Sequence, residues 1–455
     1  MTRLSVTDAL RASFAAALRA AEPGALVERH LPAEVPSLIL AVGKGALGMV
    51  APARLRFATT RWIASPPRSG AHEADLLDGG LVLPGSHPLP DVGSERAAAA
   101  ALAAVGALGG DDLVLVLVSG GGSALWSAPR GIDLTAKRDL IDHLLRAGAD
   151  IDQLNVVRKH LSRIKGGLLA RATRARVVTL ALSDVPGDDP ATIASGPTVP
   201  DASTYGEALA VLDRFGVVSG AARSHVADGA RGLVAETPKP GDEIEGRSQV
   251  RVIGSNQTLL DAAADHWRRQ GVPVIVLSDA LTGEARVLAK AHADLATALA
   301  RGDDASAALA ALAPPGQAAG LILRAASALQ VAGRRQVAVL SGGEATVRVT
   351  GSGRGGRNQE FALWLHHYLR RTGSDGDVAA LVAGSDGVDG NSPAAGAVIS
   401  ATTAARAASL GLSPAAYLQD NDSHSFFEGL GDTVVTGPTG TNLNDYRVML
   451  IGPEG

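Results

Sequence analysis

Residues 112–126 constrain the fold more than any other stretch of the chain. Six consecutive apolar residues, Leu113 to Val118, predict a strand buried on both faces, as in a parallel sheet. The strand runs into Ser119-Gly120-Gly121-Gly122-Ser123, a loop with two hydroxyls and no larger side chain. Backbone N–H groups in such a loop can approach an anion closely, and ligands of open α/β sheets bind where strands end. The loop is therefore predicted to bind phosphate; a tight turn without a ligand is the alternative.

The composition is that of a soluble globular protein with well-filled cores. A length of 455 residues predicts two or three domains, and 46% hydrophobic residues suffice for their interiors. The net charge of −4 gives no field for nucleic acid or anionic membranes, so neither is an expected partner. The chain has no cysteine, which excludes disulfides and thiolate chemistry. With no signal-peptide pattern at residues 6–21, a cytoplasmic monomer or homodimer is expected.

A second glycine loop follows the predicted strand 37–42. Gly43-Lys44-Gly45-Ala46-Leu47-Gly48 matches the spacing of the dinucleotide fingerprint, but the confirming acidic residue about 20 positions later is missing. Arg68 stands near that place and would suit a 2′-phosphate. This pattern keeps open an NADP-dependent oxidoreductase. Lys44 is the more informative residue, because a cation at a strand end can meet a phosphate or a carboxylate.

A helix is predicted over residues 154–169, where apolar residues recur at spacings of three and four. Beside this stripe lie Asn155, Arg158, Ser162 and Lys165, which the same spacing stacks on one flank. Two cations along the buried edge are unusual for a plain surface helix. We expect this flank to face a site for anionic groups.

Aspartates follow two further predicted strands. Asp184 comes directly after the strand 177–182, and Asp386 follows the strand 378–383. Carboxylates at strand ends are ligands that Mg²⁺ accepts together with phosphate oxygens and water. Both are therefore predicted magnesium ligands, and one of them could instead act as a base.

The second half of the chain is predicted to form another α/β domain after a border at 236/237. Residues 251–277 read as a strand–helix–strand unit with Asn256 as helix cap, and residues 283–329 as a loose helical excursion. A strand at 337–340 is expected to pair antiparallel with 345–350. A helix starts near Arg357, whose guanidinium in a glycine loop suits an oxyanion.

Glycine loops, cations and strand-end aspartates in both halves indicate phosphoryl transfer in an interdomain cleft. The order of several long motifs also resembles the glycerate 2-kinase (class II, MOFRL-containing) family. They are SHPLPD (86–91), SGGGSA (119–124), NVVRKHLSRIKGG (155–167), SDVPGDDPATIASGP (183–197), GSN (254–256), SGGE (341–344), GGRNQE (355–360), DG (386–387) and TGPTGTNLN (436–444).

This resemblance implies ATP- and Mg²⁺-dependent phosphorylation of D-glycerate to 2-phosphoglycerate. It implies a Rossmann-like N-terminal domain with a parallel sheet, residues 1–236, and a smaller C-terminal α/β domain with a mixed sheet, residues 237–455. The MOFRL-like part covers about 335–452. The functional lysine and arginine of the family carry onto Lys44 and Arg357. Sequences that resemble this family are sometimes named hydroxypyruvate reductases, so an NADP-dependent hydroxypyruvate reductase is the alternative, supported by the Gly43–Gly48 pattern and Arg68.

The expected site residues fall into three groups. The catalytic ones are Lys44, Arg357 and Asp184; those binding substrate or phosphate are Ser119, Gly120, Gly121, Gly122, Ser123, Asn155, Arg158, Lys165, Gly254 and Asn256; the metal ligands are Asp184 and Asp386.

Overall fold

The computed structural model describes residues 5–68, 80–332 and 336–452. The chain forms two compact units, each with its own sheet. The first unit contains residues 22–254, and the second contains residues 255–455 together with residues 1–21. Within the described ranges, every helix is too short or too polar to cross a bilayer.

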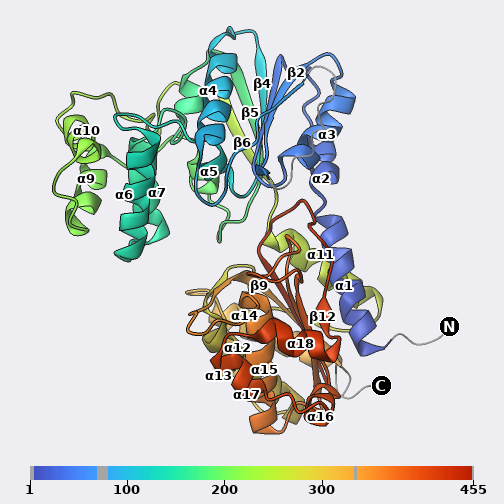
Figure 1. Ribbon diagram of the computed structural model, residues 1–455. Helices are drawn as coiled ribbons and strands as arrows, with labels where there is room; N and C mark the ends of the chain where they lie inside the picture. The colour runs from blue at the N-terminus through green and yellow to red at the C-terminus, as the bar shows by residue number, and fades with distance from the viewer. Residues whose placement is uncertain (1–4, 69–79, 333–335, 453–455) are drawn as a thin grey trace. The chain divides into compact units, whose positions relative to one another are not determined.

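A parallel sheet of six strands organises the first unit (Figure 1). Its strand order, β3-β2-β1-β4-β5-β6, is that of doubly wound α/β folds. The predicted central strand is confirmed: β4 lies between β1 and β5, and all of its residues are buried. The strands are β1 (Leu38–Val42), β2 (Arg61–Ser65), β3 (Gly80–Val82), β4 (Leu113–Val118), β5 (Arg176–Leu182) and β6 (Ser248–Gly254).

Helices of the first unit either pack on the sheet or form a separate group beside it. The helices α6, α7, α9 and α10 form this group and share an apolar core that includes Leu144, Val157 and Leu212 (Figure 1). The helices are α2 (Pro23–His30), α3 (Ala46–Arg56), α4 (Val92–Gly106), α5 (Gly122–Leu125), α6 (Leu134–Arg146), α7 (Ile151–His160), α8 (Leu168–Arg171), the 3₁₀ turn Ile193–Ser195, α9 (Tyr205–Arg214) and α10 (Ala221–Ala230).

The second unit is built on a mixed sheet of seven strands. The order is β12-β11-β10-β13-β9-β7, and β8 also pairs with β9. Strands β7 and β8 run parallel to β9, whereas the remaining pairs are antiparallel. The strands are β7 (Val274–Val276), β8 (Leu281–Glu284), β9 (Val337–Thr346), β10 (Val378–Gly384), β11 (Gly396–Ile399), β12 (Thr433–Val434) and β13 (Asp445–Ile451). The predicted fold class, a parallel sheet followed by a mixed one, is thus confirmed.

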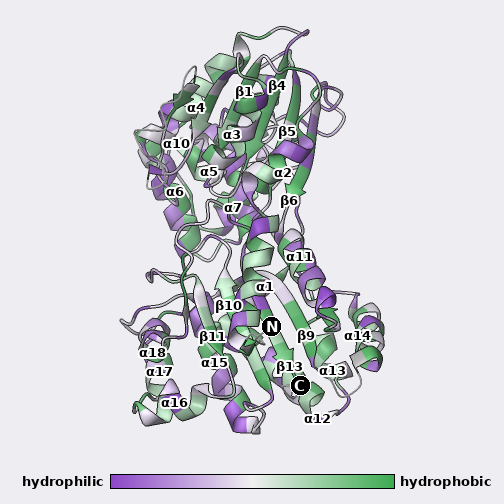
Figure 2. Ribbon diagram, turned by 90° about the vertical axis from the view of Figure 1, so that its right-hand side faces the viewer, coloured by the Kyte–Doolittle hydropathy of each residue, from purple (hydrophilic) through white to green (hydrophobic). Residues whose placement is uncertain are grey.

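The helices of the second unit cover this sheet, and the strands of both sheets are largely hydrophobic (Figure 2). Helix α12 packs against α15, and the N-terminal α1 packs against α11. The helices are α1 (Val6–Ala20), α11 (Asn256–Arg269), α12 (Ala285–Arg301), α13 (Ser306–Ala311), α14 (Ala318–Ala332), α15 (Arg357–Thr372), α16 (Thr403–Ser409), α17 (Pro414–Gln419) and α18 (Ser423–Leu430).

The division of the chain differs from the predicted border at 236/237. Strand β6 pairs with β5 in the first sheet, so the first unit continues to Gly254. Helix α1 belongs to the second unit, where Ser13 Oγ lies 2.7 Å from the Tyr446 hydroxyl. The expected strand–helix–strand unit at 251–277 is wrong for the same reason, because β6 and β7 lie in different sheets. Local patterns identify strands but not their partners.

Four local expectations are also corrected. The helix predicted over 154–169 ends at His160, because Leu161 leaves the helical conformation and Ser162 pairs with Pro129 in an isolated bridge. Residues 337–346 form one strand, so the expected turn at 341–344 is absent from it. Helix α12, expected on a loose surface, buries Ala289, Ala293 and Ala296. Ser255, not Asn256, caps α11 through a capping box with Thr258.

Candidate active site

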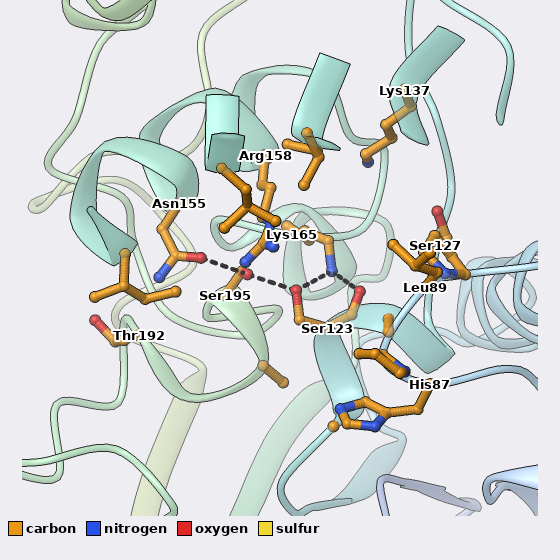
Figure 3. Close-up of a pocket in the computed structure, with 18 of the residues that line it drawn as sticks. His87, Leu89, Ser123, Ser127, Lys137, Asn155, Arg158, Lys165, Thr192 and Ser195 are labelled. Carbon is orange, nitrogen blue, oxygen red and sulfur yellow. Dashed lines mark hydrogen bonds between the residues drawn. The ribbon is translucent and has the colours of Figure 1, made fainter. Parts of the chain in front are cut away.

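A cavity of about 380 Å³ opens where strands β4 and β5 of the first unit end (Figure 3). Polar side chains line its inner part: Ser123, Lys137, Asn155, Arg158, Lys165, Asp184, Thr192 and Ser195. Leu89, Ile141, Leu145 and Ile151 add apolar surface. The cavity therefore combines a cationic floor with an apolar rim.

The glycine loop after β4 is held rigidly against the loop after β1. The amide of Lys44 donates to Gly120 O at 2.8 Å, and the amide of Gly45 donates to Ser119 Oγ at 2.9 Å. The two loops approach so closely that a Cβ on Gly43 would lie 2.2 Å from Ser119 Oγ. Only glycine fits at position 43, where φ is also +119°.

These contacts bear on the dinucleotide fingerprint. The amides of Lys44 and Gly45 already bond to the neighbouring loop and are not available to a pyrophosphate. Arg68, the residue suited to a 2′-phosphate, forms an ion pair of 2.6 Å with Asp91. The geometry of this loop gives no support to NADP binding.

His87 and Gly121 line one corner of the cavity, whereas Lys44, a predicted catalytic residue, is not among the lining residues and lies near His87. A Cβ on Gly121 would lie 2.9 Å from His87 Cδ2, so this ring rests on the glycine loop. Burial and then the nearby charge of Lys44 lower the pKa of His87. The imidazole is therefore neutral at physiological pH and can donate or accept a hydrogen bond at the cavity wall.

Three basic side chains, Lys137, Arg158 and Lys165, gather at the floor of the cavity (Figure 3). Burial and then the charge of Arg158 lower the pKa of Lys137 to about 7. Burial, then Lys137 and Arg158, lower the pKa of Lys165 well below its usual value. Mutual repulsion of this kind is relieved when an anion enters, so the arrangement is suited to binding one.

A chain of hydrogen bonds crosses the floor of the cavity (Figure 3). Lys165 Nζ lies 3.0 Å from Ser123 Oγ, which lies 2.9 Å from Ser195 Oγ. Ser195 Oγ in turn donates to Asn155 Oδ1 at 3.2 Å. Lys165 Nζ also donates to the carbonyl oxygens of Ser123 at 2.6 Å and Trp126 at 3.2 Å.

The structure brings together six of the predicted residues of the first unit and leaves others outside the lining. Gly121, Ser123, Asn155, Arg158, Lys165 and Asp184 line the cavity. Ser119, Gly120 and Gly122 shape the loop behind it, where a Cβ on Gly122 would lie 2.9 Å from Ala194 Cβ. Gly254 instead faces Leu26 and Leu182, which leave no space for a side chain.

Sequence reasoning missed Lys137 as a site residue and assigned no role to Ser195. Lys137 lies on the amphipathic helix α6 together with Arg138 and Arg146, which are exposed, and the sequence gives no signal that separates Lys137 from these two. It is buried, however, and donates to Leu161 O at 3.0 Å. Ser195 belongs to a hydroxyl- and glycine-rich turn, and its unusual backbone, with φ of +61°, is visible only in the structure.

In the second unit, Arg357 begins α15 and binds two carboxylates. Its Nε donates to Asp445 Oδ1 at 2.7 Å and its Nη1 donates to Glu344 Oε1 at 2.8 Å. Asp445 is fully buried and also accepts from Arg447 Nη2 at 2.6 Å. This network fixes the direction of the Arg357 guanidinium.

Asn256 and Asp386 have local contacts in the same unit. Asn256 Nδ2 donates to the carbonyl oxygens of Leu443 and Asp445 at 2.7 and 2.8 Å, which ties α11 to the sheet. Asp386 Oδ1 accepts from the amide of Val388 at 3.2 Å. Over residues 5–68, 80–332 and 336–452, His, Asp and Glu side chains form no group of three or more that could hold a metal ion.

Comparison with known proteins assigns the chain to a family. Residues 9–227 match a family described as a domain of unknown function, DUF4147, and residues 337–445 match the MOFRL family. The D-glycerate 2-kinase of Thermotoga maritima is 33% identical over 422 residues, covering 91% of this chain and 90% of its own length. The chain belongs to the MOFRL-containing glycerate kinase family. The resemblance in the motifs is thereby confirmed.

Two further relatives are similar to the chain along nearly its whole length. The crystal structure of a glycerate kinase from Thermotoga maritima superposes with a TM-score of 0.82 at 31% identity, covering 98% of this chain and 99% of that one. A protein of Agrobacterium vitis that carries the name of a hydroxypyruvate reductase is 39% identical, covering 99% of this chain and 95% of its own.

Proposed function

We propose that the protein is a glycerate 2-kinase that transfers the γ-phosphoryl group of ATP to the 2-hydroxyl of D-glycerate. The similarity to the Thermotoga D-glycerate 2-kinase along nearly the whole chain carries this proposal. The cavity supports it independently, because Lys137 and Arg158 suit an anionic ligand and ATP and glycerate are both anions. Phosphoryl transfer depends mostly on positioning and on neutralising charge, which such a floor provides.

The proposed roles of the cavity residues follow from their contacts. Arg158 and Lys137 face the cavity and would hold phosphate or carboxylate oxygens, with the glycine loop Ser119–Ser123 shaping the wall beside them. Lys44 and Arg357 correspond to the functional lysine and arginine of the family. Asn155 orients Ser195 through the hydrogen bond described above.

Magnesium is proposed to accompany ATP. Mg²⁺ is usually bound by one or two carboxylates together with phosphate oxygens and water, so it needs no protein cage. Asp184 faces the cavity and is a suitable single carboxylate; Asp386 is the other candidate, in the second unit. The ion would neutralise phosphate charge. A role for Gly254 or Asn256 in binding substrate has no support beyond the motif, because packing and backbone contacts account for both.

An assay of ADP release with ATP, Mg²⁺ and D-glycerate tests the function directly. Phosphorus NMR of the product should give the 2-phosphoglycerate signal, and L-glycerate should be a poorer substrate. A parallel reaction with NADPH and hydroxypyruvate tests the reductase alternative, and we expect no NADPH oxidation. NADPH oxidation without 2-phosphoglycerate formation would overturn the proposal.

A further inference from the structure

The chain Lys165–Ser123–Ser195–Asn155 has the geometry of a proton relay rather than of a simple anion clamp. An ammonium group has three N–H bonds, and Lys165 Nζ has three acceptors within 3.2 Å: Ser123 O, Ser123 Oγ and Trp126 O. An ammonium that satisfies all three has no N–H left for a bound anion. Lys165 is also only 2% exposed, so it cannot easily turn toward a ligand.

The same contacts suit a neutral amine. A neutral lysine would donate its two N–H bonds to the two carbonyl oxygens and direct its lone pair at Ser123 Oγ. Burial and the charges of Lys137 and Arg158 favour that form by lowering the pKa of Lys165. A serine hydroxyl hydrogen-bonded to a neutral lysine is a recurrent arrangement for moving a proton.

The turn that carries Ser195 is strained and firmly anchored. Ala194 and Ser195 both have positive φ angles, +51° and +61°, a conformation that is unfavourable for residues other than glycine. The turn is held against the segment after Lys165, where the amide of Gly166 donates to Ser195 O at 2.9 Å. Gly122 lets the turn approach the β4 loop closely. The anchoring brings the Ser195 hydroxyl to the cavity wall and within 2.9 Å of Ser123.

We propose that Lys165 is the terminal acceptor of the proton that the substrate hydroxyl loses, and that Ser195 and Ser123 pass that proton to it. This proposal rests on the proposed kinase function. As the substrate oxygen bonds to the γ-phosphorus and the bond from phosphorus to the β,γ-bridging oxygen breaks, the substrate proton moves to Ser195 Oγ. The Ser195 hydroxyl, which donates to Asn155 Oδ1 in the resting site, turns toward Ser123 Oγ and passes its proton there, and the Ser123 proton moves to Lys165 Nζ. The amine becomes an ammonium, and ADP leaves with the bridging oxygen.

Substitution of Lys165 by arginine separates the relay from a purely electrostatic role. Arginine keeps the positive charge and the donors but cannot act as a base, because its pKa exceeds 12. The relay predicts that Lys165→Arg lowers kcat by about 10²–10⁴-fold, the usual contribution of general-base catalysis, with KM for ATP within about threefold. A charge clamp predicts nearly unchanged kcat.

Smaller substitutions at the two serines provide a second test in case the Lys165→Arg variant does not fold. Ser195→Ala and Ser123→Ala remove one hydroxyl each and should lower kcat by about 10²-fold while leaving both KM values within about threefold. Lys159→Arg is the matched control: Lys159 is also a buried lysine, but it pairs with Asp201 at 3.2 Å and does not line the cavity. Its kcat should stay within about twofold of wild type, and thermal melting would verify folding of every variant.

The pH dependence of kcat distinguishes the relay from a purely structural role of these residues. A residue that only stabilises the fold would not change the shape of the pH profile. In wild type, log kcat should rise with unit slope on the acidic side as Lys165 loses its proton, and Ser195→Ala should flatten this limb. His87, Lys137, Arg138, Arg158 and Asp184 also line the cavity, so a limb that persists unchanged in Ser195→Ala belongs to one of them.

The outcomes distinguish the relay from the function on which it depends. An inactive wild-type enzyme would overturn both. An active wild type with near-normal kcat in Lys165→Arg or Ser195→Ala would overturn the relay alone. Selective loss of kcat in both variants, with a flattened acidic limb and a normal Lys159→Arg control, would support it.

Discussion

At the scale of single residues, Asp445 organises the second unit around the Arg357 side chain. This fully buried carboxylate accepts hydrogen bonds from Arg357, Asn358 and Arg447 and from the amide of Ala345. Arg447 is a near neighbour in the sequence, but Ala345, Arg357 and Asn358 lie 87 to 100 residues before Asp445, so no local motif reveals the network. Glu344 binds the same guanidinium but is 44% exposed in its side chain.

These two carboxylates should differ strongly in their contribution to stability. Asp445→Asn removes the negative charge from a buried cluster with two arginines and should lower the free energy of unfolding by about 3–5 kcal/mol. Glu344→Gln breaks a partly exposed pair and should cost less than about 1 kcal/mol. Urea denaturation followed by circular dichroism measures both. Similar losses of unfolding free energy in the two variants would mean that burial does not determine how much each carboxylate contributes to stability.

At the scale of elements, the sequence predicts strands, caps and loops better than it predicts which elements pack together. The apolar run of β4 and the start of α15 are local patterns, and both were predicted. The break after α7 comes at Leu161, where the chain turns to pair with a distant segment: Ser162 forms a bridge with Pro129, and the amide of Arg163 donates to Ala128 O at 2.9 Å. The predicted polar flank nevertheless reaches the cavity, because Asn155, Arg158 and Lys165 line it on both sides of that break.

Helix α12 shows how an alanine-rich helix can be buried without looking apolar. His292 on this helix is 1% exposed. Its Nδ1 donates to Leu288 O at 2.8 Å, and its Nε2 accepts from Ser341 Oγ at 2.9 Å. Burial and then the charge of Arg447 lower the pKa of His292 to about 3. An imidazole on a loose surface helix would not be shifted in this way.

This depressed pKa predicts a specific loss of stability in acid. The unfolded chain binds a proton near pH 6.5, whereas folded His292 binds one only near pH 3, so stability is lost as the pH falls between these values. Between pH 6 and pH 4 the loss should be about 2–3 kcal/mol. His292→Gln should remove that part of the slope in urea denaturation. Ser341→Ala keeps the imidazole, so its free energy of unfolding should be about 1 kcal/mol lower at every pH, with the same dependence on pH. If His292→Gln left the pH dependence of stability unchanged, the assignment to His292 would be wrong.

At the scale of the whole molecule, the sequence indicates two α/β units but not where the chain divides between them. The Pro/Gly-rich stretch near 236–245 resembles a linker, yet β6 still follows it within the first sheet. The first helix looks like the start of an N-terminal domain, yet it packs in the second unit. Both errors have one cause. The pairing of β5 with β6 and the packing of α1 in the second unit join segments far apart in the sequence through tertiary contacts that composition does not encode.

The role of α1 gives a test of this division. Leu10, Phe14 and Ala17 of α1 are buried, and the Phe14 and Tyr446 rings lie 5.2 Å apart. Burial of a large apolar side chain contributes about 1.5–3 kcal/mol, so a fragment 255–455 without α1 should be poorly folded. Adding a synthetic peptide of residues 1–21 should restore its cooperative melting, whereas a peptide with Leu10→Asp and Phe14→Asp should not.

The first unit provides the complementary half of this experiment. A fragment 22–254 contains all six strands of its sheet and should melt cooperatively on its own. A fragment 1–236 lacks β6, which exposes the backbone edge of β5, and carries α1 without its packing partners. We therefore expect it to aggregate, because an unprotected edge strand pairs readily with other chains. Two results together would instead support the border at 236/237. Fragment 1–236 would melt cooperatively as a monomer, and fragment 255–455 would be as stable without the peptide as with it.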